Sequence, residues 1–152
     1  MDFMTETKQS NVTVKVVSGL EDVDRAMQVR YAVFVKEMGF EPYQVFGVQD
    51  LEAEHVLAED GDGLAVGSAQ IFHGPGEDSI AGLAVLNGQR KLGTGSAIMK
   101  LLLARSSAPR LQMQCPLDKV SFVRGFGFEP EGEAFLLGVL EQQKMVMIKP
   151  TS

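Results

Sequence analysis

The sequence of 152 residues is poor in the residue types that build disulfides and structural metal sites. It contains one cysteine, Cys115, two histidines and no tryptophan. One cysteine cannot form an internal disulfide, and two histidines without a cysteine cluster do not make a structural metal site. We therefore expect neither a disulfide framework nor a bound metal.

Long apolar runs and basic clusters are also missing. No run approaches the roughly 18 apolar residues that cross a membrane, and the start (MDFMTE) lacks the basic and apolar regions of a signal peptide. The net charge of −6 argues against nucleic acid, whose phosphates bind basic clusters. We expect a cytoplasmic protein with a cationic or neutral partner, with no nucleic acid and no membrane, although an acidic balance also serves solubility.

Length and composition favour a single globular domain. Of the residues, 45% are hydrophobic and 22% are charged, which suffices for a substantial core. The sequence predicts one domain over residues 11–152, without internal repeats or linkers. Residues 1–10 are polar and terminal, and we expect them to be flexible.

The order of hydrophobic patterns predicts a mixed α/β fold. Alternation indicates a strand at 12–16, helical spacing a helix at 21–36, and residues 37–50 form a loop or a broken helix. The sequence DGDG at 60–63 predicts a tight hairpin. The other expected elements are strands at 55–59, 64–72, 80–86, 111–115, 134–140 and 144–149, a helix at 97–105 and a short helix within 116–124.

A glycine-punctuated turn, residues 90–96 (RKLGTGS), follows the strand at 80–86 and opens into a helix. The first N–H groups of a helix have no intrahelical partner, so they can converge on an anion that the helix dipole also favours. Gly93 and Gly95 let the backbone come close to a ligand. The pattern indicates a site for a phosphorylated cofactor, with a plain turn as the alternative.

The flanking side chains suit phosphate, since Arg90 and Lys91 add positive charge and Ser96 adds a hydroxyl. Two familiar phosphate loops do not fit. The turn lacks the Gly-Lys-Ser/Thr ending of a Walker loop, and it has neither the third glycine nor the later acidic residue of a Rossmann fingerprint.

Four motifs in order resemble the GNAT superfamily of acyl-CoA-dependent N-acyltransferases. Residues 90–95 (RKLGTG) are similar to its Gln/Arg-x-x-Gly-x-Gly/Ala motif. Residues 30–39 (RYAVFVKEMG) resemble the Arg-x-x-Val-Phe-Val-x-Glu-Gln-Gly of one bacterial and fungal branch, and residues 50–55 (DLEAEH) its Asp-x-x-Ala-x-His. Residues 122–128 (FVRGFGF) are similar to its Phe-Tyr-x-x-x-Gly-Phe.

The resemblance implies a central mixed sheet of about seven strands with helices on both faces. Its fourth and fifth strands would splay apart around the pantetheine arm of acetyl-CoA, and strand backbone groups would polarise the thioester. Ordinary strand core explains Leu83 and Val85 as well. The implied residues for acetyl-CoA or CoA are Leu83, Ala84, Val85, Arg90, Lys91, Leu92, Gly93, Thr94, Gly95, Ser96 and Phe122.

The chain departs from its relatives at the proton donor. Val123 stands where many members have a tyrosine that protonates the departing thiolate, and Gln142 stands where the branch often has histidine. Cys115 is a candidate catalytic residue, because a thiol with a pKa near 8.5 can donate to a thiolate. A water molecule, or no donor, is the alternative, and a buried structural role for Cys115 is the more common one.

The acceptor side is assigned to Glu37, Phe40 and Tyr43, because loops on a rigid scaffold often carry function. A surface carboxylate and aromatic residues that close the core explain the same residues. We expect acetyl transfer to a primary amine of a small molecule or peptide by direct attack. The alternative is a weak or inactive acyl-CoA-binding module. The acceptor, the acyl-chain preference and homodimer formation stay open.

Overall fold

The computed structural model describes residues 6–9 and 11–150, and these divide into two compact units. Unit one holds the described residues up to Ile71 together with Gly82–Arg105. Unit two holds Phe72–Ala81 and the described residues from Ser106 onward. The expectation of a single domain over residues 11–152 stays a prediction.

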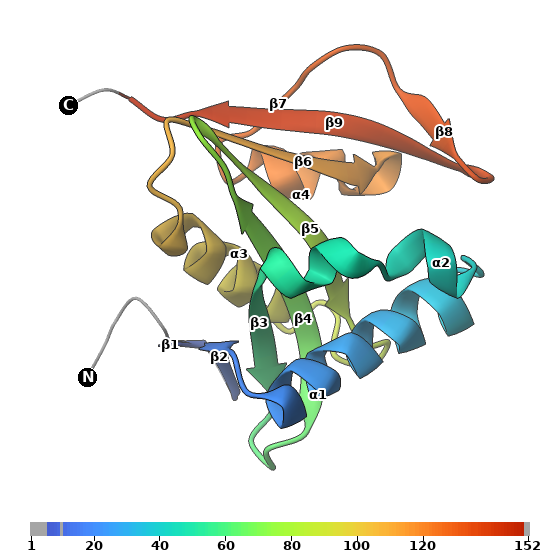
Figure 1. The fold of residues 1–152 in the computed structure, drawn as a ribbon, viewed down its shortest axis with the longest axis vertical. Helices are drawn as coiled ribbons and strands as arrows, with labels where there is room; N and C mark the ends of the chain where they lie inside the picture. Colours follow the sequence, from blue (N-terminus) through green and yellow to red (C-terminus); the bar gives the residue numbers. More distant parts are fainter. Residues whose placement is uncertain (1–5, 10, 151–152) are drawn as a thin grey trace. The chain divides into compact units, whose positions relative to one another are not determined.

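Unit one is built on antiparallel strands. They are β1 (Glu6–Gln9), β2 (Val12–Val17), β3 (Glu54–Glu59) and β4 (Ala65–His73), each paired with the next (Figure 1). The strand β1 lies in the segment expected to be flexible; residues 1–5 and 10 of that segment lie outside the described residues.

The DGDG hairpin is confirmed at the turn between β3 and β4. One carboxylate oxygen of Asp60 accepts the backbone N–H groups of Asp62 and Leu64, both at 2.9 Å. Asp60 thereby fixes the turn through its own side chain.

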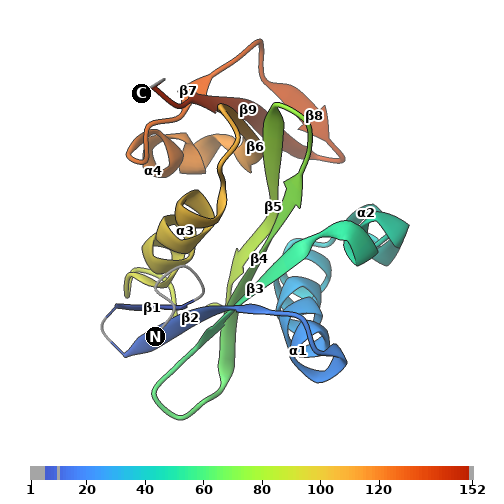
Figure 2. The same ribbon diagram turned by 60° about the vertical axis from the view of Figure 1, so that its left-hand side comes forward.

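Helices cover both faces of the unit-one strands, as expected. The helix α1 (Leu20–Arg30) packs against β3, and α3 (Thr94–Arg105) packs against β1, β2 and β3 on the other face (Figure 2). The predicted helix at 21–36 has its expected extent, but its second half, Tyr31–Glu37, is a π-helix. Two short helices follow, α2 (Pro42–Val45) and a 3₁₀ helix (Val48–Glu52), which confirms the broken helix.

Unit two consists of a smaller group of strands around one long strand. This strand, β9 (Leu140–Ile148), pairs antiparallel with β6 (Arg110–Pro116), and the short α4 (Val120–Arg124) packs against both. The short strands β7 (Glu129–Pro130) and β8 (Phe135–Leu137) also pair with β9.

The prediction was wrong about the turn between the last two strands. Residues 141–143 were expected to separate them, whereas the structure has β8 end at Leu137 and β9 begin at Leu140. Gly138 takes φ +64°, a conformation that glycine adopts without strain, so it makes the turn inside an apolar sequence.

The strand β5 (Glu77–Val85) is the fourth of the seven predicted strands. Its residues 77–80 pair in parallel with Arg110–Met113 of β6, the fifth predicted strand; among the described residues this register ends at Ile80. The nine strands of the described chain follow the order β1-β2-β3-β4-β5-β6-β9-β7, with β8 on β9. The mixed α/β class is confirmed.

Candidate functional site

The strand β5 has a backbone irregularity at Gly82, directly before the expected pantetheine-binding residues. Gly82 has φ +64°, and a Cβ atom there would lie 3.1 Å from Nε of Arg30 and 3.1 Å from Oε1 of Gln70. A left-handed residue inside a strand marks a local irregularity of the kind found next to active sites. Glycine is therefore favoured here by its conformation, and a Cβ atom would press on the side chains of Arg30 and Gln70.

A buried polar network lies behind Gly82. Arg30 is 3% exposed, and its Nη1 contacts Oδ1 of Asp50 at 3.4 Å. Gln70 donates to the same oxygen at 2.8 Å, and the N–H of Gly47 donates to the other at 3.1 Å. Burial lowers the pKa of Arg30, and the charge of Asp50 opposes that effect. The network joins α1, the 3₁₀ helix and β4.

His55 belongs to the same network. Its Nε2 lies 2.9 Å from the carbonyl oxygen of Asp50, its Nδ1 has no hydrogen-bond partner among the described residues, and the residue is 6% exposed. This agrees with a structural histidine. Arg30 belongs to the motif at 30–39, and Asp50 and His55 belong to the motif at 50–55. The sequence did not indicate that the two motifs meet in one network.

The residues expected to hold the pyrophosphate form a tight turn ahead of α3. Gly93 has φ +88° and Lys91 has φ +67°. The helix begins at Thr94, three residues before the expected start. The backbone N–H of Ala97 donates a hydrogen bond to the carbonyl oxygen of Gly93 at 3.0 Å. The N–H groups of residues 94–96 are therefore those of the first turn, which lack intrahelical partners.

Thr94 adds a feature that the sequence did not reveal. It is 1% exposed, and its Oγ1 has no hydrogen-bond partner among the described residues. An unpaired buried hydroxyl costs free energy, so its persistence needs an explanation. Together with the glycine turn and the start of α3, this hydroxyl fits a site for an anionic group.

Arg90 and Glu37 meet each other, although the sequence placed them on the cofactor side and on the acceptor side. The guanidinium donates to both carboxylate oxygens of Glu37, at 2.5 and 2.6 Å. Its Nε donates to the carbonyl oxygen of Val85 at 2.9 Å. The hydrogen bond from Arg90 lowers the pKa of Glu37. The Val85 carbonyl therefore already accepts one hydrogen bond, from Arg90.

The aromatic residues expected near the acceptor separate into two roles. Tyr43 lies on α2 and is 80% exposed, whereas Phe40 is half-buried. Phe46 stacks on Tyr31, with 6.4 Å between ring centroids, and lies 4.8 Å from the guanidinium carbon of Arg30. Phe46 thus covers the buried network, while Tyr43 presents its ring to solvent.

The expected residues of unit two are mostly buried. Cys115 is 3% exposed, and burial, followed by the nearby charge of Asp118, raises its pKa. The thiol therefore stays protonated at neutral pH. Val123 is 1% exposed, so a tyrosine there would overpack the unit. Phe122 meets Phe126 edge to face, with 5.2 Å between centroids.

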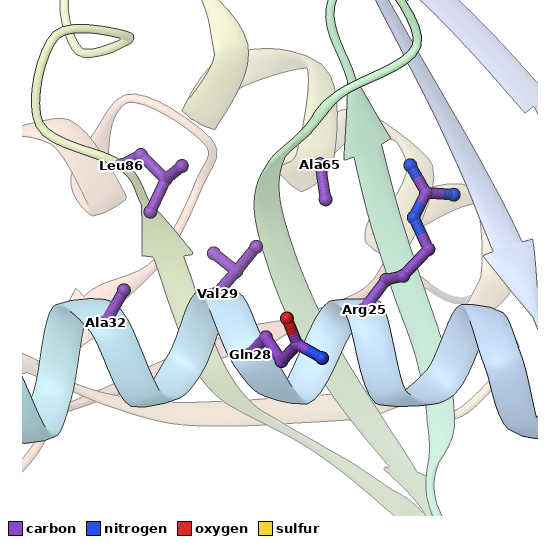
Figure 3. A pocket seen from close by; sticks show the side chains of 6 residues that line it. All are labelled: Arg25, Gln28, Val29, Ala32, Ala65 and Leu86. Atoms are coloured by element: carbon purple, nitrogen blue, oxygen red, sulfur yellow. The ribbon is translucent and has the colours of Figure 1, made fainter.

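Two hollows lie on unit one. One, of about 280 Å³, lies along α1, and none of its residues was predicted for the site (Figure 3); they are Arg25, Gln28, Val29, Ala32, Ala65 and Leu86. The other, of about 560 Å³, includes Leu92 of the turn 90–96; its lining is Asn11, Val12, Asp60, Gly61, Asp62, Gln89 and Leu92. Within the described residues, every helix is too short or too polar to cross a bilayer.

No family model and no curated protein matches the chain, but solved structures do. The fold is that of the GNAT acyltransferases, which confirms the resemblance at the level of the fold. ElaA of Escherichia coli is 22% identical, with a TM-score of 0.78 over 90% of this chain and 99% of ElaA. An acyl-CoA N-acyltransferase from Pseudomonas aeruginosa is 20% identical, with a TM-score of 0.77 over 90% and 97%.

A third structure carries the cofactor. A GNAT family acetyltransferase from Elizabethkingia anophelis, solved with acetyl-CoA bound, is 12% identical, with a TM-score of 0.65 over 93% of this chain and all of that one. At these identities the likeness establishes the fold.

Proposed function

We propose that the protein binds acetyl-CoA and transfers the acetyl group to a primary amine by direct attack. The observation that carries the proposal is the turn 90–96: Lys91 and Gly93 take positive φ, α3 begins directly after them, and the buried Oγ1 of Thr94 lacks a partner among the described residues. An anion at a helix start explains all three. The acetyl-CoA bound to the Elizabethkingia relative supports this choice of anion.

Acetyl-CoA, when bound, supplies a thioester acyl group: an N–C amide bond forms, the C–S bond breaks, and the amine proton goes to the leaving thiolate. The N–H groups at the start of α3 would hold the pyrophosphate. The main chain of Leu83 and Ala84, which follows the irregularity at Gly82, would orient the pantetheine and polarise the acyl carbonyl. Cys115 or water would relay this amine proton to the thiolate.

The test of the binding step is the substitution Gly95→Val, with CoA affinity measured by calorimetry. A branched side chain where backbone must meet phosphate should weaken binding at least about tenfold in a folded protein. Gly19→Val is the control: Gly19 lies directly before α1, where a Cβ meets nothing within 4 Å, whereas Gly95 lies in the first turn of α3. Unchanged CoA affinity in folded Gly95→Val would contradict the proposed site.

A binding module without turnover is the second candidate. Val123 has no proton to donate, and Cys115 is almost fully buried, which favours this reading. Release of free thiol from acetyl-CoA with a panel of small amines, polyamines, amino sugars and peptides separates the two. Turnover with any amine supports the transferase; binding without turnover supports the module.

A further inference from the structure

The side chain of Arg90 joins three segments of unit one. Arg90 lies in the turn 90–96, which we call the cofactor turn. Its guanidinium donates two hydrogen bonds to Glu37, the last residue of the π-helix, and a third to the carbonyl oxygen of Val85 at the end of β5. We call these three bonds the Arg90 clasp. A bidentate guanidinium–carboxylate pair fixes orientation as well as distance, which a lysine cannot do.

The turn held by the clasp has an unusual backbone. Gly88, Lys91 and Gly93 all have positive φ, at +97°, +67° and +88°. Glycines lose much conformational freedom on ordering, and a left-handed lysine is strained, so this turn does not hold its shape by local preference. Contacts to other segments must hold it, and the Arg90 clasp supplies three.

On the basis of the proposed function, we propose that Glu37 is a positioning residue for acyl-CoA, acting through Arg90 on the cofactor turn. In this arrangement Glu37 does not serve as a contact for the amine acceptor. Both oxygens of its carboxylate accept from Arg90, so the charge that would attract a cationic amine is already paired.

Removal of the Glu37 carboxylate has two opposite effects on CoA affinity, and the larger effect decides whether the affinity rises or falls. The freed charge of Arg90 would strengthen anion binding by at most about fivefold, the range of exposed ion pairs. Ordering the backbone of a single residue costs about tenfold in an equilibrium constant, and the turn contains several residues. Loss of order therefore outweighs the freed charge, and CoA affinity falls.

The experiment compares Glu37→Ala, Glu37→Gln and Arg90→Lys with the native protein. Amide hydrogen exchange of residues 88–93 without ligand reports the order of the turn, calorimetry reports CoA affinity, and steady-state kinetics report KM for each substrate. Glu37→Gln keeps one acceptor oxygen, and Arg90→Lys keeps the charge without the fork. The matched control is Glu52→Gln, the same change at an exposed residue of unit one.

We expect Glu37→Ala to speed exchange and weaken CoA binding about tenfold, with acceptor KM unchanged. Arg90→Lys should behave like Glu37→Ala, Glu37→Gln should fall between, and Glu52→Gln should match the native protein. Three results would each contradict the proposed role of Glu37: unchanged amide exchange of residues 88–93, a rise in CoA affinity, or a rise in acceptor KM alone. If the native protein binds no CoA, the proposed function fails, and the exchange rates still decide whether Glu37 orders the turn.

Discussion

At the scale of single residues, Lys91 stands apart from the rest of the described chain. It is the one described non-glycine residue with a positive φ, at +67°. A side chain in this region costs about 1–2 kcal/mol relative to the right-handed form. Glycine takes this conformation without such a cost, so the lysine side chain is what strains the turn.

Lys91 combines backbone strain with a positive charge in the proposed anion-binding turn, and its replacement changes both. Lys91→Gly relieves strain but loosens the unfolded chain by about 0.5–1 kcal/mol, so the free energy of unfolding should change by less than about 1 kcal/mol. CoA affinity should fall about threefold, and its dependence on salt should weaken.

The measurement is chemical denaturation together with CoA calorimetry at two salt concentrations. Lys119→Ala, which removes the same charge from an exposed position of unit two, is the control and should leave affinity unchanged. Equal loss of affinity in both variants would show that only net charge matters.

The site was predictable from the sequence where its chemistry is local, and hidden where it depends on distant partners. The glycine turn at 90–96 was visible because glycines, cations and a following helix are adjacent in the chain. The pairing of Arg90 with Glu37 joins residues 53 positions apart, and no local pattern signals it. The unpaired hydroxyl of Thr94 was also hidden, because burial is a property of packing.

At the scale of elements, the same distinction holds. The hairpin after β3 was predicted because Asp60 fixes it with its own side chain. The π-helix Tyr31–Glu37 was not, because a helical hydrophobic spacing does not distinguish the two helix types. The turn at Gly138 was missed because it interrupts an apolar run that alternation assigns to one strand.

The irregularity in β5 gives a prediction that separates conformation from contact. Gly82→Ala and Gly39→Ala both place a side chain at positive φ, +64° and +84°, so each should lose about 1–2 kcal/mol of stability. A Cβ at Gly39 meets nothing within 4 Å, whereas one at Gly82 presses on Arg30 and Gln70 at 3.1 Å. Gly82→Ala should therefore cost about 1–3 kcal/mol more.

Urea denaturation of the two variants measures this difference directly, and CoA calorimetry adds a functional readout. We expect Gly82→Ala alone to weaken CoA binding, because it disturbs the main chain that leads to Leu83 and Ala84. Equal destabilisation of the two variants would mean that the buried network yields to the added methyl group, and that it does not support β5.

At the scale of the whole molecule, charge pairing shapes the response to acid. The chain carries 20 acidic residues against 14 lysines and arginines, so its carboxylates dominate titration below neutral pH. Paired carboxylates with lowered pKa occur in both units, including Glu59 in unit one and Asp78 in unit two. In Asp78, burial raises the pKa, and the hydrogen bonds led by Ser106 and His73 outweigh that effect.

Glu59 offers the cleanest test of this acid response. It lies on β3 and accepts from Lys15 of β2 and Arg25 of α1, both at 2.8 Å. The hydrogen bond from Lys15, helped by Arg25, lowers its pKa below the ordinary 4.5 despite partial burial. The Glu59 carboxylate therefore binds a proton more tightly in the unfolded chain than in the folded protein. Its contribution to folding stability is complete above about pH 4.5 and disappears as pH falls through the pKa of Glu59 in the folded protein.

Glu59→Gln should therefore lower Tm at pH 7, and the difference should shrink as pH falls below about 4.5. Two partly exposed ion pairs contribute about 1 kcal/mol, which corresponds to about 2–4 °C in a chain of this length. Scanning calorimetry from pH 3 to pH 8 measures the gap between variant and native protein, and Glu52→Gln, an exposed carboxylate on the same unit, should show no gap. A gap of constant size at every pH would mean that Glu59 stabilises by packing, since only its charge is lost on protonation.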